Sequence, residues 1–385
     1  MLTLLNNAMV FAPQRCGMRN LLIGGGQILA ISETPLVATG ATVIDLAGQR
    51  LLPGFIDGHA HVTGGGGEAG FKTRVPPPGL SDFTSAGVTS VVGVLGTDDT
   101  TRDTRALLAQ TNALRDEGMG AWCHTGGYHV PPVTLMQNVR DDIVHLDPVI
   151  GVGELAISDH RSSQPTLAEL LRIASDTHVA GLITRKAGIL HLHLGDGPRG
   201  MALIRQALHE TELPARVFNP THINRRKALL DEAIDLARQG CTVDITAFPV
   251  ADDEDAWAAD VALIRYLDSG APANQITISS DGGGCLPVFD HQGVMVSMDV
   301  GRASALLVTL VTLLNKGMPL EVALPAFTSN VADLLRLPGR GHIQLGYQAD
   351  LLVLDDNNSL SGVMIAGRWH RKDGQQIIKG YFEHP

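Results

Sequence analysis

The sequence has no long hydrophobic run and no cluster of basic residues. Its most apolar segment, Ala303–Leu314, contains two threonines and is shorter than the roughly 20 residues of a membrane-spanning helix, so we expect no membrane span. The 29 Lys and Arg residues are outnumbered by 40 Asp and Glu residues, which gives a formal net charge of −11. Without a basic patch, neither nucleic acid nor an anionic membrane surface is an expected partner.

Cysteine is also scarce. The four cysteines, Cys16, Cys123, Cys241 and Cys285, are scattered and form no CxxC pair. In a chain of this size that pattern indicates reduced thiols and predicts a cytoplasmic protein. The first residues lack the basic region that precedes the apolar core of a signal peptide, so we expect no signal peptide.

The middle of the chain has the pattern of parallel β/α units. The chain has 385 residues, too many for one small core. From residue 53 onward, apolar segments of strand length alternate with segments of helical periodicity. We predict strands at residues 55–62, 89–96, 120–128, 149–157, 189–195, 216–223, 242–248 and 276–282. Plausible helices lie between several of them, at residues 104–117, 167–178, 201–211, 227–239 and 256–269. Eight such units predict a (β/α)8 TIM barrel over residues 53–337, with its active site at the carboxyl ends of the strands.

The two chain ends have a different pattern. Residues 1–52 read as short strands and turns, and the apolar runs on either side of Gly24–Gly26 are typical of a β-hairpin. Residues 338–385 return to strand patterning. We therefore predict that both ends pair to form one small β-sandwich domain.

Two histidines stand at the end of the first barrel strand, in the segment Pro53–His61. Side chains alternate across a strand with period two, so His59 and His61 point to the same side. Two neighbouring imidazoles can bind a single metal ion such as zinc.

Polar residues recur on other predicted strands. Glu154 lies on the fourth, His193 at the end of the fifth, His222 at the end of the sixth and Asp281 at the end of the eighth. Burying such groups unpaired is costly, and a shared metal centre removes that cost. Six nitrogen and oxygen ligands suit two ions that share a bridging carboxylate and a hydroxide.

The chain resembles the amidohydrolase superfamily and, more narrowly, the isoaspartyl (β-aspartyl) dipeptidases. The broad resemblance lies in Pro53–His61, in the two later histidines, in Asp281 and in Gly346–Leu354. The narrow resemblance lies in Gly64–Gly70, Thr89–Asp98, Gly127–Pro131, Ala156–Ser162, Pro220–Arg225 and Val243–Thr246. These segments cover nearly the whole chain in the family's order.

The resemblance implies a metal-dependent hydrolase of isoaspartyl dipeptides with two divalent ions, which we expect to be Zn²⁺. By position, His59 and His61 would hold one ion, and His193 and His222 the other. Asp281 would ligate the first ion and act as general base, taking a proton and passing it to the leaving amine.

The resemblance also implies residues that bind a zwitterionic dipeptide. Glu68 would pair with its α-amino group, while Arg161 and Arg225 would hold its carboxylates. Tyr128 would donate a hydrogen bond to the developing oxyanion. Further substrate contacts are implied at Gly66, Thr97 and Cys285.

Two positions depart from the family pattern. Glu154 stands where the family often has a carboxylated lysine that bridges the metals, and the chain has one extra residue between Gly151 and that position. A glutamate is shorter, but it could bridge two ions if the strand bulges inward at the extra residue. Cys285 stands where a serine is expected, and a thiol is the weaker hydrogen-bond donor.

Several alternatives stay open at this point. The centre could hold one ion instead of two. The substrate could be a cyclic amide or an N-acyl amino acid, as for hydantoinase-like or dihydroorotase-like enzymes, and it would then lack the α-amino group that Glu68 is expected to meet. The barrel could also be a non-catalytic assembly protein. The family is typically oligomeric, so we expect a homo-oligomer.

Overall fold

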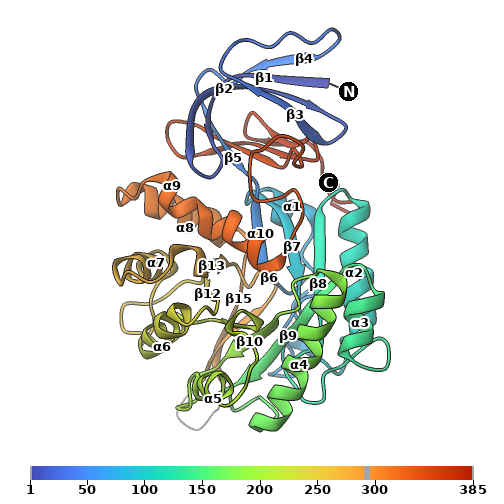
Figure 1. Cartoon of the computed structure of the whole chain (residues 1–385), viewed down its shortest axis with the longest axis vertical. Helices are drawn as coiled ribbons and strands as arrows, with labels where there is room; N and C mark the ends of the chain where they lie inside the picture. Colours follow the sequence, from blue (N-terminus) through green and yellow to red (C-terminus); the bar gives the residue numbers. More distant parts are fainter. Residues whose placement is uncertain (1, 290–294, 384–385) are drawn as a thin grey trace.

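The computed structural model describes residues 2–289 and 295–383, and it has two regions (Figure 1). Both chain ends contribute to one β-sheet, which we call the terminal sheet, at the top of the view. The middle of the chain forms a larger α/β region beneath it. Among the helices of the described residues, none has the length and apolar character needed to cross a membrane.

The terminal sheet has nine strands. The N-terminal part supplies β1 (Leu2–Phe11), β2 (Arg15–Gly24), β3 (Gln27–Ser32), β4 (Thr42–Asp45) and β5 (Arg50–Pro53). The C-terminal part supplies β16 (Leu351–Leu354), β17 (Leu360–Ile365), β18 (Arg368–Lys372) and β19 (Gln375–Gln376). The two parts meet where β5 pairs antiparallel with β16. β2 and β3 form the predicted hairpin, with Gly25 and Gly26 at positive φ in its turn.

These nine strands belong to one sheet rather than to the two sheets of the predicted sandwich. The sheet is curled, as two hydrogen bonds between its distant parts show: Ile28 N–H donates to Tyr347 O (2.9 Å) and Ala349 N–H donates to Gly26 O (2.8 Å). Its β3 edge thereby meets the segment that leads into β16. The apolar side chains of this region are buried in one cluster that includes Leu5, Leu21, Leu51, Leu351 and Val353. A curled sheet can cover its own inner face, so a second sheet is not required.

The α/β region contains the eight predicted strands. Six lie parallel, in chain order, in one sheet: β6 (Phe55–Ala60), β7 (Val88–Gly93), β8 (Gly120–Thr125), β9 (Val149–Ile157), β10 (Leu190–Leu194) and β11 (Phe218–Thr221). β12 (Val243–Thr246) and β13 (Ile276–Ser279) form a second parallel pair. The strands are found where the sequence predicts them, although most end earlier. The region is thus a mixed α/β structure with a parallel half-barrel sheet.

Helices connect these strands. The five predicted helices are α2 (Thr104–Asp116), α4 (Leu167–Thr184), α5 (Ala202–Glu210), α6 (Lys227–Arg238) and α7 (Ala259–Asp268). The other α-helices are α1 (Leu80–Thr84), α3 (Val139–His145), α8 (Ser304–Asn315), α9 (Leu320–Ala323) and α10 (Ser329–Leu335). Short 3₁₀ helices lie at Phe71–Thr73, Ala215–Val217, Ala273–Gln275 and Leu324–Phe327. α2 begins after Asp103, whose carboxylate accepts a hydrogen bond from Ala106 N–H. α4 begins with a capping box between Thr166 and Glu169.

One hairpin of the structure is not predicted from the sequence. β14 (Cys285–Phe289) and β15 (Met295–Val300) pair antiparallel directly after the last parallel strand. Val288 and Val296 are 48% and 61% exposed. Among the hairpin residues whose burial is described, only Pro287 is buried, so the hairpin lacks the regular alternation of buried and exposed residues by which strands are recognised in a sequence.

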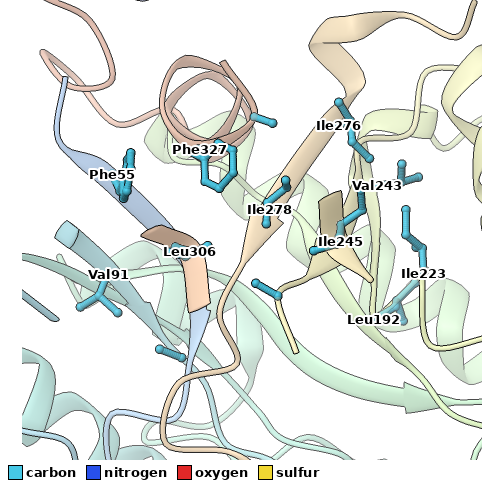
Figure 2. Packing of buried hydrophobic residues seen from close by; sticks show 14 of the residues in the cluster. Phe55, Val91, Leu192, Ile223, Val243, Ile245, Ile276, Ile278, Leu306 and Phe327 are labelled. Carbon is cyan, nitrogen blue, oxygen red and sulfur yellow. The ribbon is translucent and has the colours of Figure 1, made fainter. Parts of the chain in front are cut away.

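A continuous apolar core joins the parallel strands to the helices around them (Figure 2). In Figure 2, Ile278 and Ile245 lie near the middle of the view, with Val91 and Leu306 on one side and Leu192 on the other. At the border with the terminal sheet, the rings of Phe55 and Phe327 pack with centroids 5.5 Å apart. This packing sets the strand ends, and hence the polar side chains on them, in fixed positions.

Candidate metal centre

His59 and His61 face Asp281, as the alternation of the strand predicts. His59 is the penultimate residue of β6, and His61 directly follows that strand. Their Nε2 atoms lie 3.4 and 3.1 Å from Asp281 Oδ1. Backbone hydrogen bonds hold this arrangement, because Asp281 N–H donates to His59 O (3.1 Å) and His61 N–H donates to Gly282 O (2.8 Å).

Glu154 lies between two pairs of histidines. Its Oε1 is 3.6 Å from His59 Nε2 and 3.3 Å from His61 Nε2. Its Oε2 is 3.0 Å from His193 Nδ1 and 3.3 Å from His222 Nε2. Each carboxylate oxygen therefore faces a different histidine pair, which is the arrangement that a bridging ligand needs.

The bulge expected beside Glu154 is present in β9. Leu190 of β10 pairs with Val152, whereas Leu192 pairs with Leu155, so β9 has one extra residue across this interval. The shift falls at the position of the extra residue in the sequence, and Glu154 is 1% exposed. A glutamate thus reaches both histidine pairs in this chain.

The second histidine pair is held differently at its two members. His222 Nδ1 is 2.7 Å from Thr246 Oγ1, which leaves Nε2 facing Glu154. Both ring nitrogens of His193 already have partners, since Nδ1 faces Glu154 and Nε2 lies 2.9 Å from Asp159 Oδ2. His222 and Asp281 adopt φ angles of 62° and 53°, a conformation that non-glycine residues rarely adopt outside functional or strained sites.

Burial and neighbouring charges set the protonation of the cluster. Burial alone would lower the pKa of His61, but the neighbouring carboxylates of Asp281 and Glu154 raise that pKa to about 10. Burial would raise the pKa values of Asp281 and Glu154, yet the adjacent imidazoles hold both below their ordinary range. Burial lowers the pKa of His222 to about 3. The two carboxylates are therefore ionised, and both they and the imidazoles around them are shielded from water.

These atoms fit a divalent cation. Two groups of potential ligand atoms lie within 4.8 Å of one another: His59, Glu154 and His222, and His59, His61 and Asp281. His59 Nε2 and Asp281 Oδ1 are buried, and neither makes a well-aligned hydrogen bond with any described residue. Such atoms are costly unless something else satisfies them, and nitrogen and oxygen donors are ligands for zinc and similar ions. Within the described part of the chain, His193 belongs to neither group.

The residues predicted to bind substrate line a small cavity at this centre. The cavity is lined by His61, Gly66, Glu68, Gly96, Thr97, Tyr128, Glu154, Arg161, His193, His222, Arg225, Asp281 and Cys285. This set contains every predicted site residue except His59, which is fully buried. Gly96 was not predicted, and its place beside Thr97 is the only sequence signal for it.

Charged side chains meet on one side of this cavity. Glu68 Oε1 lies 3.3 Å from Arg161 Nη1 and 3.1 Å from Cys285 Sγ, so the thiol donates to the carboxylate. Tyr128 Oη lies 2.8 Å from His193 Nδ1. Arg225 Nη1 is 3.4 Å from His193 Nε2, and Arg225 Nε is 3.3 Å from Asp196 Oδ1.

Asp159, in the segment Ala156–Ser162, also belongs to this group of contacts, although it is not among the predicted site residues. Its Oδ1 and Oδ2 accept from Arg161 Nε (3.0 Å) and Nη2 (2.7 Å), and Oδ2 also faces His193. It thus connects a residue predicted to bind substrate with a predicted metal ligand. Its spacing of two residues from Arg161 is the signal that could have identified it.

A wider cleft of about 1060 Å³ adjoins the cavity and shares His222, Arg225 and Asp281 with it. Its apolar lining includes Phe248, Leu286 and Met298. The hairpin of β14 and β15 forms one wall, so this cleft was not foreseen from the sequence.

Comparisons with known proteins identify the family. The model of the amidohydrolase family matches residues 50–370. The structure is similar to that of a β-aspartyl dipeptidase from the thermophilic, keratin-degrading Fervidobacterium islandicum AW-1 in complex with β-Asp-Leu. The two chains are 40% identical, with a TM-score of 0.92 over 98% of this chain and 99% of the other.

Two further matches are more distant. A D-hydantoinase structure is 15% identical, with a TM-score of 0.70 over 99% of this chain and 98% of the other. An imidazolonepropionase from Ruegeria sp. (strain TM1040) is 25% identical over 357 residues, which are 87% of this chain and 86% of that protein. By the extent of the family match and the full-length identity to the dipeptidase, the chain belongs to the amidohydrolase family and groups with its β-aspartyl dipeptidases.

Proposed function

We propose that the protein hydrolyses β-aspartyl dipeptides with the help of divalent metal ions. The observation that carries this proposal is the agreement between two independent findings. A relative 40% identical over its full length was crystallised with β-Asp-Leu. In this chain, a carboxylate that faces two histidine pairs adjoins a cavity with Glu68, Arg161 and Arg225 in its wall.

The proposed centre holds two Zn²⁺ ions. His59, His61 and Asp281 would bind one, His193 and His222 the other, and Glu154 would bridge them. The division of the Glu154 oxygens between the two pairs supports two sites rather than one. For His193 to bind the second ion, one of its ring nitrogens would have to give up its present hydrogen bond. That nitrogen would be Nδ1, or another after the ring has turned.

Metal ions at this centre would acidify a water molecule and polarise the scissile carbonyl. Asp281 is the proposed general base and acid: it takes a proton from the attacking water and delivers it to the leaving amine. Tyr128 is the proposed donor to the oxyanion, and its hydroxyl lies beside His193 at the cavity wall.

The proposed substrate contacts follow the charges of the cavity. Glu68 would bind the α-amino group, and Arg161 and Arg225 would bind carboxylates. Asp159 holds the Arg161 guanidinium through two hydrogen bonds, which orients it before substrate arrives. Gly66, Thr97 and Cys285 complete the wall, and Cys285 presently donates to Glu68.

We also propose that the strands from β6 to β13 close into a (β/α)8 barrel over residues 53–337, with residues 1–52 and 338–385 as the second domain. The hydrogen bonds from Asp281 N–H to His59 O and from Ile223 N–H to Asp244 O (3.3 Å) support the closure. Residues 1, 290–294, 384 and 385 lie outside the described part. A homo-oligomer in the cytoplasm is the proposed form, and the four free thiols support a reducing compartment.

A comparison of substrates tests this function. Protein loaded with Zn²⁺ is assayed with β-Asp-Leu, with α-Asp-Leu as the matched normal peptide and with hydantoin, and its metal content is measured. We expect hydrolysis of β-Asp-Leu with a kcat/KM far above that for the other two. Hydrolysis of hydantoin alone would favour a cyclic-amide hydrolase, while absent metal and absent turnover would indicate a non-catalytic protein.

Glu68→Gln sharpens the test, because only a substrate with a free α-amino group needs this carboxylate. We expect kcat/KM for β-Asp-Leu to fall about 10- to 100-fold, the usual effect of losing a hydrogen bond to a charged group. Glu254→Gln, in the wall of the wide cleft, is the matched control and is expected to keep the rate. Equal activity of Glu68→Gln and the control would refute the assigned role of Glu68.

A further inference from the structure

A chain of buried polar side chains leads from His59 away from the cavity. His59 Nδ1 lies 2.8 Å from His191 Nε2, and His191 Nδ1 lies 2.6 Å from Asn219 Oδ1. Asn219 Nδ2 donates to the backbone oxygen of Thr242 at 2.7 Å. The three side chains are 0–2% exposed, so water does not compete for these contacts.

The Thr242 carbonyl, at the far end of this series of hydrogen bonds, determines the direction of every hydrogen bond in the series. The Thr242 carbonyl can only accept, so Asn219 turns its NH₂ group to Thr242 and its carbonyl oxygen to His191. His191 must then donate from Nδ1. In neutral His191 this leaves a lone pair on Nε2, which accepts a hydrogen bond from His59 Nδ1–H.

The consequence for His59 is one defined tautomer. With its proton on Nδ1, neutral His59 presents the lone pair of Nε2 to the metal centre, where Glu154 Oε1 and Asp281 Oδ1 lie 3.6 and 3.4 Å away. The other tautomer would place a proton on Nε2, where it would donate to a carboxylate instead of binding an ion.

The fold holds the rings of these hydrogen-bonded histidines in place. His191 and Asn219 are direct partners in the parallel register of β10 and β11, so the sheet sets their side chains next to each other. The His124 ring stacks on His191 with centroids 5.4 Å apart and planes 26° apart, and the His59 ring lies 5.0 Å from His191. The His191 ring therefore has little freedom to turn.

We propose that His191 and Asn219 are positioning residues that hold His59 in the tautomer and orientation required for metal binding. This inference rests on the proposed function for the presence of an ion. Partners behind a metal-binding histidine typically contribute about 10- to 100-fold to metal affinity. The ion held by His59 is the one whose affinity depends on them.

The test measures Zn²⁺ affinity by competition with a chromophoric chelator, without any substrate. His191→Phe keeps the ring volume but removes the acceptor for His59, and we expect the dissociation constant of one Zn²⁺ to rise about 10- to 100-fold. His191→Gln restores a carbonyl acceptor at similar reach and should recover part of the affinity. Asn219→Leu, which frees His191 to choose either tautomer, should have a smaller effect of the same sign.

His370→Phe is the matched control, because His370 is also a buried histidine (2% exposed) but lies in β18 of the terminal sheet. We expect it to bind Zn²⁺ as the unchanged protein does. Folding of each variant is checked by circular dichroism, and Asn219→Leu and His191→Gln decide the matter if His191→Phe does not fold.

Two results would overturn the inference, and they can be told apart. If the unchanged protein binds no Zn²⁺, the metal centre of the proposed function falls and this inference with it. If the unchanged protein binds Zn²⁺ and a folded His191→Phe or Asn219→Leu variant binds it equally well, the positioning role alone is refuted.

Discussion

The terminal sheet and the metal centre are both built from buried strands, but they bury opposite kinds of side chain. The core of the terminal sheet is apolar, with residues such as Leu5, Leu21 and Leu51 fully buried. The strand ends at the metal centre bury histidines and carboxylates, including His59 and Glu154. Apolar burial stabilises a fold, whereas buried polar groups cost stability unless they are satisfied. The comparison separates a region that serves stability from one that serves chemistry.

The largest effect on activity is expected at the metal centre. Asp281→Asn should lower kcat for β-Asp-Leu by about 10²- to 10⁴-fold, the range expected for loss of a general base. Metal content should largely survive, because Asn keeps one oxygen, and elemental analysis with steady-state kinetics checks both points. Asp299→Asn, on β15 at the wall of the wide cleft, is the control with the same chemical change. A normal rate in Asp281→Asn would disprove its role as base.

The largest effect on stability is expected in the terminal sheet. Leu21→Ala removes a fully buried side chain and should lower the free energy of unfolding by about 3–5 kcal/mol. Leu29→Ala, in the same sheet but 44% exposed, is the control and should cost much less. Denaturant unfolding measures both, and kcat should not change in either. A large loss of kcat in Leu21→Ala would show that the two regions are coupled.

Metal removal should affect stability through the centre alone. An ion present at 100 times its dissociation constant stabilises the folded state by about 2.7 kcal/mol, so chelation should lower stability by roughly that amount. The loss of folding stability on chelation should be equal in the unchanged protein and in Leu21→Ala, because the effects of distant sites on stability are additive. Different decrements, measured by thermal unfolding with and without chelator, would contradict the separation of the regions.

The smallest effect concerns the one buried histidine of the described terminal sheet. Burial, aided by the charge of Arg368, lowers the pKa of His370 to about 4. In the unfolded chain the pKa is about 6.5, so the unfolded state binds more protons between these values and stability is lost as the pH falls. From pH 7 to pH 5 we expect a loss of about 1–2 kcal/mol from this residue.

His370→Phe should remove that part of the pH dependence. Urea unfolding of both proteins at pH 7 and pH 5 measures it, and the difference between the proteins isolates His370 from the other titrating groups. The same pH dependence in both proteins would show that His370 is not held neutral by its surroundings.

Much of the fold could be predicted because its signals are local. The apolar strands from β6 to β13 and the helices between them follow from hydrophobic periodicity, which depends on neighbours in the sequence. The sequence does not predict the hairpin of β14 and β15, because Pro287 alone is buried among its residues of described burial and no alternating pattern results. The single curled sheet was missed because the hydrogen bonds between β3 and the segment near Ala349 join residues far apart in the chain.

The candidate site also has a part that the sequence predicts and a part that it does not. His59, His61, Glu154 and Asp281 could be identified because they interrupt apolar strands at or near their carboxyl ends. The contact of Asp159 with His193 and the pairing of His191 with Asn219 could not, because each depends on the register between strands.

The sequence by itself determined which residues are candidates for the chemistry and on which strands they lie, since residue type and strand period can be read along the chain. Only the tertiary structure decided how they face one another. The bulge in β9 directs the two oxygens of Glu154 to different histidine pairs, and the buried chain behind His59 selects its tautomer. Both outcomes depend on distances of a few ångströms between segments remote in sequence, and packing and strand register set those distances.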